Sequence, residues 1–230
     1  MKNKKQICLL DWDGTLRDGF TIVDWMIFLN EKRIISTEYV DKIRDLFKYY
    51  NDGRLSHDSL AVETSQVYAE SIVGIEVNFL NKIASEYIII DEARIFSFVR
   101  PLLNELRERE VDLYVISGAP IEVLRAYGSS MHLDIIHGLE IASADGHYTN
   151  TPLVNPGISS QKKKIVELYR DKFMFAAFGN SVSDIPLFEA SEKSVCINFH
   201  SHIDCKHCLK IDGNKASYRD IMLFLFTDGD

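Results

Sequence analysis

The chain has 230 residues, of which 46% are hydrophobic, and a formal net charge of -8 at pH 7. This length is sufficient for one α/β domain with an insertion and for a substantial core. The negative charge argues against nucleic-acid binding, which relies on Lys and Arg to neutralise phosphates.

No apolar stretch approaches the length that spans a membrane, and the start lacks the long apolar segment of a signal peptide. Four cysteines in a chain of this length do not suggest a disulfide scaffold. We therefore expect a protein of the reducing cytoplasm, with neither a membrane nor nucleic acid as a partner.

The first predicted element is a buried strand over the apolar residues 7–10. It leads into Asp11-Trp12-Asp13-Gly14-Thr15-Leu16. Open α/β sheets bind ligands at the carboxyl ends of their strands. Two neighbouring buried carboxylates repel each other, so such a pair needs a cation or a function. A solvated loop with a turn glycine is the alternative interpretation of this triplet.

Residues 17–95 are predicted to form a mostly helical insertion, because apolar residues recur at helical spacing between 23 and 47. Asn51-Asp52-Gly53 predicts a turn, and Ser56 is a candidate cap for a helix that continues through Tyr68. A further helix is predicted at 76–84.

From about residue 97 helices and strands alternate. The predicted helices are 98–108, 121–127, 160–169, 185–190 and 218–226, and the predicted strands are 111–116, a segment within 133–141, 173–178 and 195–197. Asp145-Gly146 predicts a hairpin turn. This alternation predicts an α/β fold with a doubly wound parallel sheet.

D-x-D-G-T after a strand resembles the first motif of the haloacid dehalogenase superfamily of phosphohydrolases. The later motifs follow in order: Ser117-Gly118 after a strand, a lysine within 162–164, and the segment 179–184. The resemblance covers nearly the whole chain. It implies a Rossmann-like core formed by 1–16 and 96–230, with 17–95 as a helical cap domain over the site. An insertion that only enlarges the core is the alternative.

The resemblance also implies the roles of the site residues. Asp11 would be the nucleophile that forms an aspartyl-phosphate, and Asp13 would protonate the leaving group and later activate water. Thr15, Ser117 and Gly118 would bind the phosphate. A Mg²⁺ cofactor would be held by Asp11, Asp13, Asn180 and Asp184. Superfamily members commonly have an aspartate where this chain has Asn180, whose amide oxygen can coordinate magnesium but carries no charge. Asp184 could therefore act on the metal or hold the lysine.

The catalytic lysine must be chosen from Lys162, Lys163 and Lys164, and a lysine run is usually a solvated helix face. In the phosphoserine-phosphatase-like branch, which this chain most resembles, the lysine precedes an apolar helix position by about three residues. Ile165 then selects Lys162, which would balance negative charge in the transition state.

Two predicted substrate-binding positions depart from phosphoserine phosphatases. Phe20 stands where those enzymes have an acid that binds the amino group, and Glu63 where they have an arginine that binds the carboxylate. The pocket is therefore expected to be rebuilt for another substrate. Phe20, Trp12 and Trp25 could suit a cationic or aromatic leaving group, but the interpretation that we favour for Phe20 and Trp25 is that they pack the cap against the core.

These observations predict a magnesium-dependent phosphatase that hydrolyses a small phosphorylated metabolite other than phosphoserine. A phosphotransferase with the same intermediate is the alternative among enzymes, and a protein that binds a phosphometabolite with little turnover is the alternative outside them. Cys205 and Cys208 form a C-x-x-C near histidines that could bind zinc. Since no second ligand pair is present, a loop is favoured there. Cys8 and Cys196 are expected to be core residues.

Overall fold

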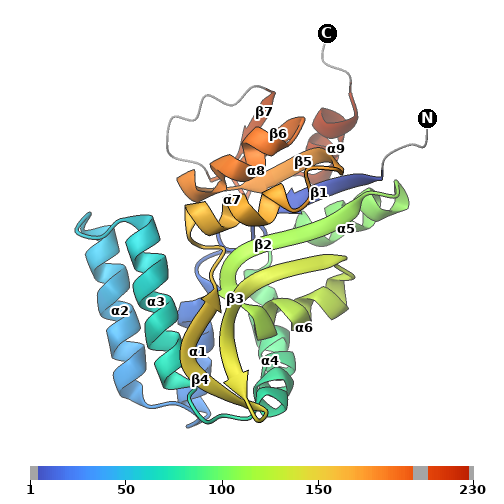
Figure 1. Ribbon diagram of the computed structural model, residues 1–230. Helices are drawn as coiled ribbons and strands as arrows, with labels where there is room; N and C mark the ends of the chain where they lie inside the picture. Colours follow the sequence, from blue (N-terminus) through green and yellow to red (C-terminus); the bar gives the residue numbers. More distant parts are fainter. Residues whose placement is uncertain (1–4, 199–206, 228–230) are drawn as a thin grey trace.

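The computed structural model describes residues 5–198 and 207–227. Figure 1 shows a central sheet with helices on both faces and a group of helices beyond one end of it. The elements are β1 (Gln6–Leu10), α1 (Thr21–Glu31), α2 (Thr37–Asn51), α3 (His57–Ser71), α4 (Val77–Asp91), α5 (Val99–Glu108), β2 (Asp112–Pro120), α6 (Ile121–Met131), β3 (Ile135–Ala144), β4 (His147–Val154), α7 (Ser159–Glu167), β5 (Phe173–Gly179), α8 (Ile185–Ala190), β6 (Lys193–Ile197), β7 (Cys208–Ile211) and α9 (Tyr218–Phe226).

The sheet among the described residues has the strand order β4-β3-β2-β1-β5-β6-β7. Every neighbouring pair is parallel except β3 and β4. The prediction of a doubly wound α/β fold is confirmed. β1 lies between β2 and β5, so the carboxyl ends of these three strands meet at one edge. The register of β2 against β3 shifts between Ile116 and Pro120, where the predicted phosphate-binding residues lie.

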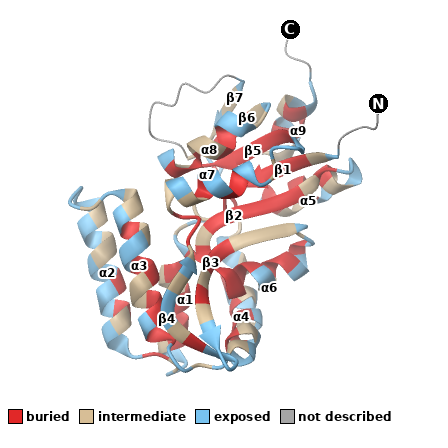
Figure 2. Ribbon diagram, viewed as in Figure 1, coloured by how far each residue is buried: buried red, intermediate tan, exposed pale blue. Residues whose placement is uncertain are grey.

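Alternate residues of β1 enter two different hydrophobic clusters. Ile7 and Leu9 pack in a cluster with residues of α7 and α8. Cys8 and Leu10 belong to the larger cluster, which contains residues of α5, α6 and α9. All four side chains are fully buried. This explains why the strand is a continuous apolar run rather than an alternating one (Figure 2).

Helices α1 to α4 lie between β1 and α5 in the chain, and within this group α3 packs against β4 and α4 against α6 (Figure 1). The chain enters and leaves this group through two adjacent segments, since Asp18 N–H donates to Arg94 O (2.8 Å) and Phe96 N–H to Leu16 O (3.1 Å). The larger cluster continues into the group through Trp25 and Leu80.

A hairpin of β3 and β4 reaches toward the helical group (Figure 1). Its turn is the predicted Asp145-Gly146, whose φ angles of 51° and 79° are both positive, as hairpin turns of this length require. Tyr148 N–H donates to Ile75 O at 3.0 Å, which attaches the hairpin to the segment before α4.

The structure differs from the sequence-based expectations at α4, which continues to Asp91 rather than ending near 84. The β-branched run Ile88-Ile89-Ile90 disfavours a helix. The helix continues because Tyr87 and Asp91, one turn apart, both bind the buried Arg17. Strand β7 was not predicted.

Cys8 and Cys196 are buried, as expected. Cys205 lies outside the described residues, so the zinc hypothesis for the C-x-x-C segment stays a prediction. Within residues 5–198 and 207–227, no helix has the length and apolar character needed to cross a membrane.

Candidate active site

The two motif carboxylates follow β1 directly. Asp11 is 5% exposed, and its Oδ2 accepts a hydrogen bond from the Thr15 hydroxyl at 3.1 Å. Asp13 Oδ1 accepts hydrogen bonds from the backbone N–H of Thr21 at 2.9 Å and from the Thr21 hydroxyl at 2.5 Å. Each carboxylate is therefore oriented by a threonine, one within the motif and one at the start of α1.

Gly14 lets the loop after β1 turn against the loop after β5. Its φ is +73°, and a Cβ built on it would lie 1.9 Å from Nδ2 of Asn180. No other residue type fits there without moving Asn180. This close approach holds the Asn180 amide beside the Asp11–Asp13 segment.

Lys162 is 1% exposed and lies between two carboxylates. Its Nζ donates to Asp11 Oδ1 at 3.0 Å and to Asp184 Oδ1 at 2.6 Å. Lys163 and Lys164 are exposed. Of the three candidate lysines the structure brings only Lys162 to the motif carboxylates, because it is on the same face of α7 as the buried Ile165.

Asp184 has protein partners on both carboxylate oxygens. Besides the bond of Oδ1 to Lys162, Oδ2 accepts the backbone N–H groups of Asn180 and Ser181, both at 2.9 Å, and the Ser181 hydroxyl at 3.1 Å. Of the two roles that the sequence left open for Asp184, this geometry matches the one that holds the lysine. The same contacts hold the loop that carries Asn180.

Burial governs the protonation of the site. Burial and the nearby Asp184 raise the pKa of Asp11, against the opposing effect of Lys162. Burial raises the pKa of Asp13 to about 6, although Arg17 and Thr21 favour its charged form. Burial disfavours the charged form of Lys162, but Asp11 and Asp184 outweigh this and its pKa is raised. The site thus has more buried negative charge than its lysine balances.

The carboxyl-terminal part of β2 meets the loop before α7. The Ser117 hydroxyl oxygen accepts a hydrogen bond from Ala119 N–H at 3.4 Å. A Cβ on Gly118 would lie 2.8 Å from Gly157 Cα, so both glycines are needed for this contact. Asn155 links the loop to the helical group, because its Oδ1 accepts Gly157 N–H (2.9 Å) and its Nδ2 donates to Ala61 O of α3 (2.7 Å). Sequence reasoning missed Asn155 and Gly157, although Asn155-Pro156-Gly157 is a recognisable turn signal.

A cavity of about 450 Å³ opens above these residues. Of the predicted site residues, those that line it are Asp11, Asp13, Phe20, Ser117, Gly118, Lys162 and Asn180. Thr15 and Asp184 do not line it and are buried behind Asp11 and Lys162, to which they are hydrogen-bonded.

The structure does not place Glu63 in the cavity. Glu63 is exposed, whereas Leu60, Ala61 and Thr64 of the same helix line the cavity. The reason is the helical period, which turns position 63 away from the face shared by 60, 61 and 64. Trp12 and Trp25 are fully buried core residues, as the packing interpretation expects.

The donor set fits one magnesium ion. In the described part of the chain no group of three His, Cys, Asp or Glu side chains is arranged to hold a metal. Asp11, Asp13 and the Asn180 amide nevertheless line one cavity and supply oxygen donors. Magnesium takes few protein ligands and completes its shell with water and phosphate oxygens. Among the described residues Lys162 bonds to Asp11 and Asp184, so a divalent cation would add the positive charge that balances Asp13 and the phosphate.

Comparison with known proteins agrees with this arrangement. The family model of the haloacid dehalogenase-like hydrolases matches residues 8–189. No curated protein sequence matches the chain.

Solved structures share the fold at low sequence identity. A substrate-bound phosphoserine phosphatase has a TM-score of 0.67 and 16% identity, covering 97% of this chain and 99% of that chain. A haloacid dehalogenase family hydrolase from Salmonella enterica subsp. enterica serovar Typhi has a TM-score of 0.70 and 14% identity. The match covers 98% of this chain and 72% of that hydrolase. A phosphoserine phosphatase from T. onnurineus has a TM-score of 0.60 and 18% identity. The match covers 98% of this chain and 97% of that phosphatase.

Proposed function

Because this chain belongs to the haloacid dehalogenase-like hydrolase family, we propose that it is a magnesium-dependent phosphatase that hydrolyses a small phosphorylated metabolite through an aspartyl-phosphate on Asp11. One observation carries the proposal. The buried Lys162 joins Asp11 to Asp184 beside a cavity that Asp13 also lines. A nucleophile, a second carboxylate and a fixed cation are thus together at the carboxyl ends of parallel strands.

In the first step an oxygen of Asp11 attacks phosphorus, and the bond between phosphorus and the leaving-group oxygen breaks. Asp13 gives its proton to that oxygen. Its pKa of about 6 keeps part of the carboxyl protonated near neutral pH. Both Thr21 hydrogen bonds fall on Oδ1, which leaves Oδ2 to carry the proton.

In the second step Asp13 takes a proton from water, the water oxygen attacks the phosphorus of the aspartyl-phosphate, and inorganic phosphate and the Asp11 carboxylate are released. Lys162 stays fixed by Asp184 and balances negative charge on the transferring group. Ser117 and Gly118 line the cavity at the end of β2, where a hydroxyl and backbone N–H groups can bind phosphate oxygens.

Magnesium would be held by Asp11, Asp13 and Asn180, and when bound it supplies positive charge to the carboxylates and the phosphate. We further propose that the helical group α1 to α4 acts as the cap of this site. Phe20, just before α1, and Phe47 and His57 of this group line the same cavity as the carboxylates. A cap of this kind excludes bulk water and recognises the leaving group.

The proposal is tested by phosphate release from a panel of small phosphomonoesters with and without Mg²⁺. We expect release by the wild type with Mg²⁺ and a loss of at least about a thousandfold in Asp11→Asn. Lys162→Met should lose at least about a hundredfold. Lys163→Met is the matched control, because the neighbouring exposed lysine should leave the rate unchanged.

Equal release by the wild type and Asp11→Asn would contradict the mechanism. No release from any ester by a folded protein that still binds phosphate would favour the binding-protein alternative. Formation of a phosphorylated acceptor when alcohols are added would identify a phosphotransferase.

A further inference from the structure

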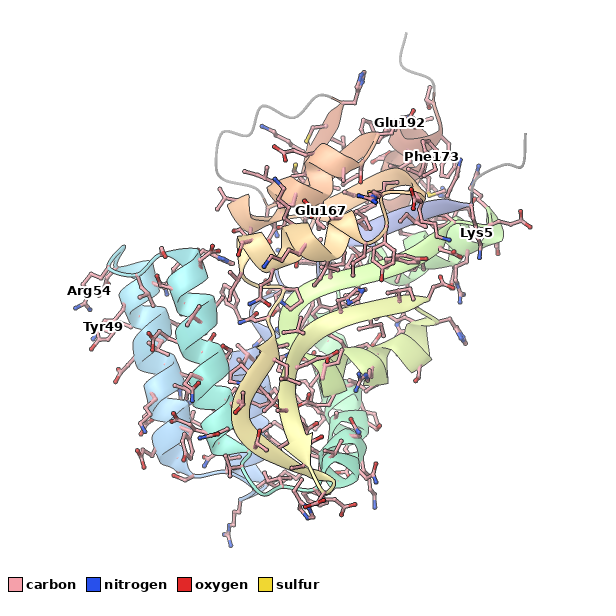
Figure 3. The ribbon with its side chains drawn as sticks, viewed as in Figure 1. Lys5, Tyr49, Arg54, Glu167, Phe173 and Glu192 are labelled. Atoms are coloured by element: carbon pink, nitrogen blue, oxygen red, sulfur yellow. The ribbon has the colours of Figure 1, made fainter. Side chains whose placement is uncertain are left out.

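Among the described residues that line the cavity, no cation is free to bind an anionic leaving group. Among its lining residues the one basic side chain is Lys162, which is already bonded to Asp11 and Asp184. Arg54, in the turn between α2 and α3, points away from the protein in Figure 3, where Tyr49 lies beside it. It pairs with Asp52 at 2.9 Å and stacks on the Tyr49 ring at 4.2 Å. A carboxylate on the leaving group would therefore be buried without a partner, which is costly.

Four aromatic side chains from the helical group and the segment before it form one wall of the cavity. Phe20 and Phe47 form a tilted pair with ring centroids 4.6 Å apart. Tyr50 and His57 form an edge-to-face pair at 6.2 Å. All four residues line the cavity. Such a wall matches a flat apolar group by stacking and edge contacts.

His57 is the polar residue of this wall whose hydrogen bonds are unmet. Its side chain lines the cavity and is 24% exposed, while its Nδ1 is buried with no hydrogen-bond partner among the described residues and lies 3.9 Å from Asp58 Oδ1. By contrast, the Thr64 hydroxyl is bonded to Leu60 O at 2.8 Å within its own helix.

Burial and the charge of Lys162 lower the pKa of His57, against the opposing effects of Asp184 and Asp58. The imidazole is therefore neutral at physiological pH and offers one donor and one acceptor rather than a charge.

We propose that the substrate is a phosphomonoester of an uncharged alcohol with an aromatic body, and that His57 determines specificity by hydrogen bonding to a neutral polar substituent on that body. This inference rests on the proposed phosphatase activity and adds the class of leaving group. It also explains how the cavity wall would distinguish one leaving group from another. Apolar rings accept the body, one neutral hydrogen-bonding group selects its substituent, and the lack of a free cation rejects carboxylates.

The test compares kcat/KM for five esters in the presence of Mg²⁺. They are para-cresyl phosphate, para-hydroxymethylphenyl phosphate, para-carboxyphenyl phosphate, phosphoserine and ethanolamine phosphate. We expect the hydroxymethyl ester to be preferred over the cresyl ester, and over the carboxyl ester and phosphoserine, by roughly tenfold or more.

In His57→Ala the preference for hydroxymethyl over cresyl should fall to near one, because kcat/KM falls further for the hydroxymethyl ester, which loses a hydrogen bond, than for the cresyl ester, which loses only a ring contact. His57→Gln retains a donor and an acceptor and should restore part of the preference, even if His57→Ala is poorly folded. Glu63→Gln is the matched control on the same helix, since its exposed side chain lies outside the cavity.

Faster cleavage of phosphoserine or the carboxyl ester would overturn the inference, as would ethanolamine phosphate as the best substrate or an unchanged preference in both His57 variants. If Asp11→Asn abolishes these activities, the proposed function still stands. Release that does not depend on Asp11 would instead contradict the proposed function itself.

Discussion

Glu122 provides a sharp test of the electrostatics of this fold. It lies in the first turn of α6, is 2% exposed, and its Oε1 has no hydrogen-bond partner among the described residues. Burial raises its pKa from 4.5 to about 7, and Arg125 and Trp25 offset this only in part. We predict that Glu122→Gln stabilises the protein at alkaline pH but much less at acid pH.

The sign follows from linkage. A carboxyl group with a raised pKa in the folded state binds its proton more tightly there than in the unfolded chain. Its contribution to stability is present below pH 4.5 and is lost as the pH rises toward about 7. Glutamine does not titrate. The gain in unfolding free energy from Glu122→Gln should therefore be larger at about pH 8 than at about pH 5, by roughly 2–3 kcal/mol.

The assay is urea unfolding of wild type and variant at both pH values, followed by tryptophan fluorescence. Glu167→Gln is the control, because Glu167 is an exposed residue of α7. It should show no gain that depends on pH. An equal gain from Glu122→Gln at both pH values would refute the reasoning, since it would mean that Glu122 titrates alike in the folded and unfolded states.

Three further changes probe the site. Asp184→Ala removes one partner of the buried Lys162 and should lower the unfolding free energy by about 3–5 kcal/mol in urea titrations. Gly118→Ala places a methyl group against the backbone of Gly157, and should cost about 1–3 kcal/mol in the same titration and at least about tenfold in kcat/KM. Asn180→Asp adds a charge beside the motif carboxylates and should lower the Mg²⁺ concentration for half-maximal rate by roughly tenfold.

Each of these has a control or a contradicting result. Asp212→Ala breaks the exposed pair with Lys215 and should cost less than about 1 kcal/mol, so an equal loss would show that burial of the Lys162 pair is unimportant. Gly53→Ala should have no effect on kcat/KM, because no atom lies within 4 Å of the Cβ position. An unchanged Mg²⁺ requirement in Asn180→Asp would remove Asn180 from the proposed metal site.

Sequence reasoning predicted the parts of the site that depend on which residues directly follow the predicted strands. Asp11 and Asp13 follow an apolar strand, and Ser117 and Asn180 follow or end two others. Since parallel strands end at one edge, these residues had to lie near one another. The choice of Lys162 over its neighbours rested on the resemblance to the phosphoserine-phosphatase-like branch, in which the lysine precedes an apolar helix position, here Ile165, by about three residues.

Contacts between distant segments were decided only by the tertiary structure. The partners of Asp184, the support of Asp13 by Thr21, and the joining of Asn155 to Ala61 depend on how loops and helices pack. A motif alignment placed Glu63 in the pocket, but the rotation of α3 about its axis is set by packing, and that rotation turns 63 outward. The local sequence determines which residues end the strands. Which residues of the helical group face those strand ends is decided only by packing, because packing sets the rotation of each helix about its axis.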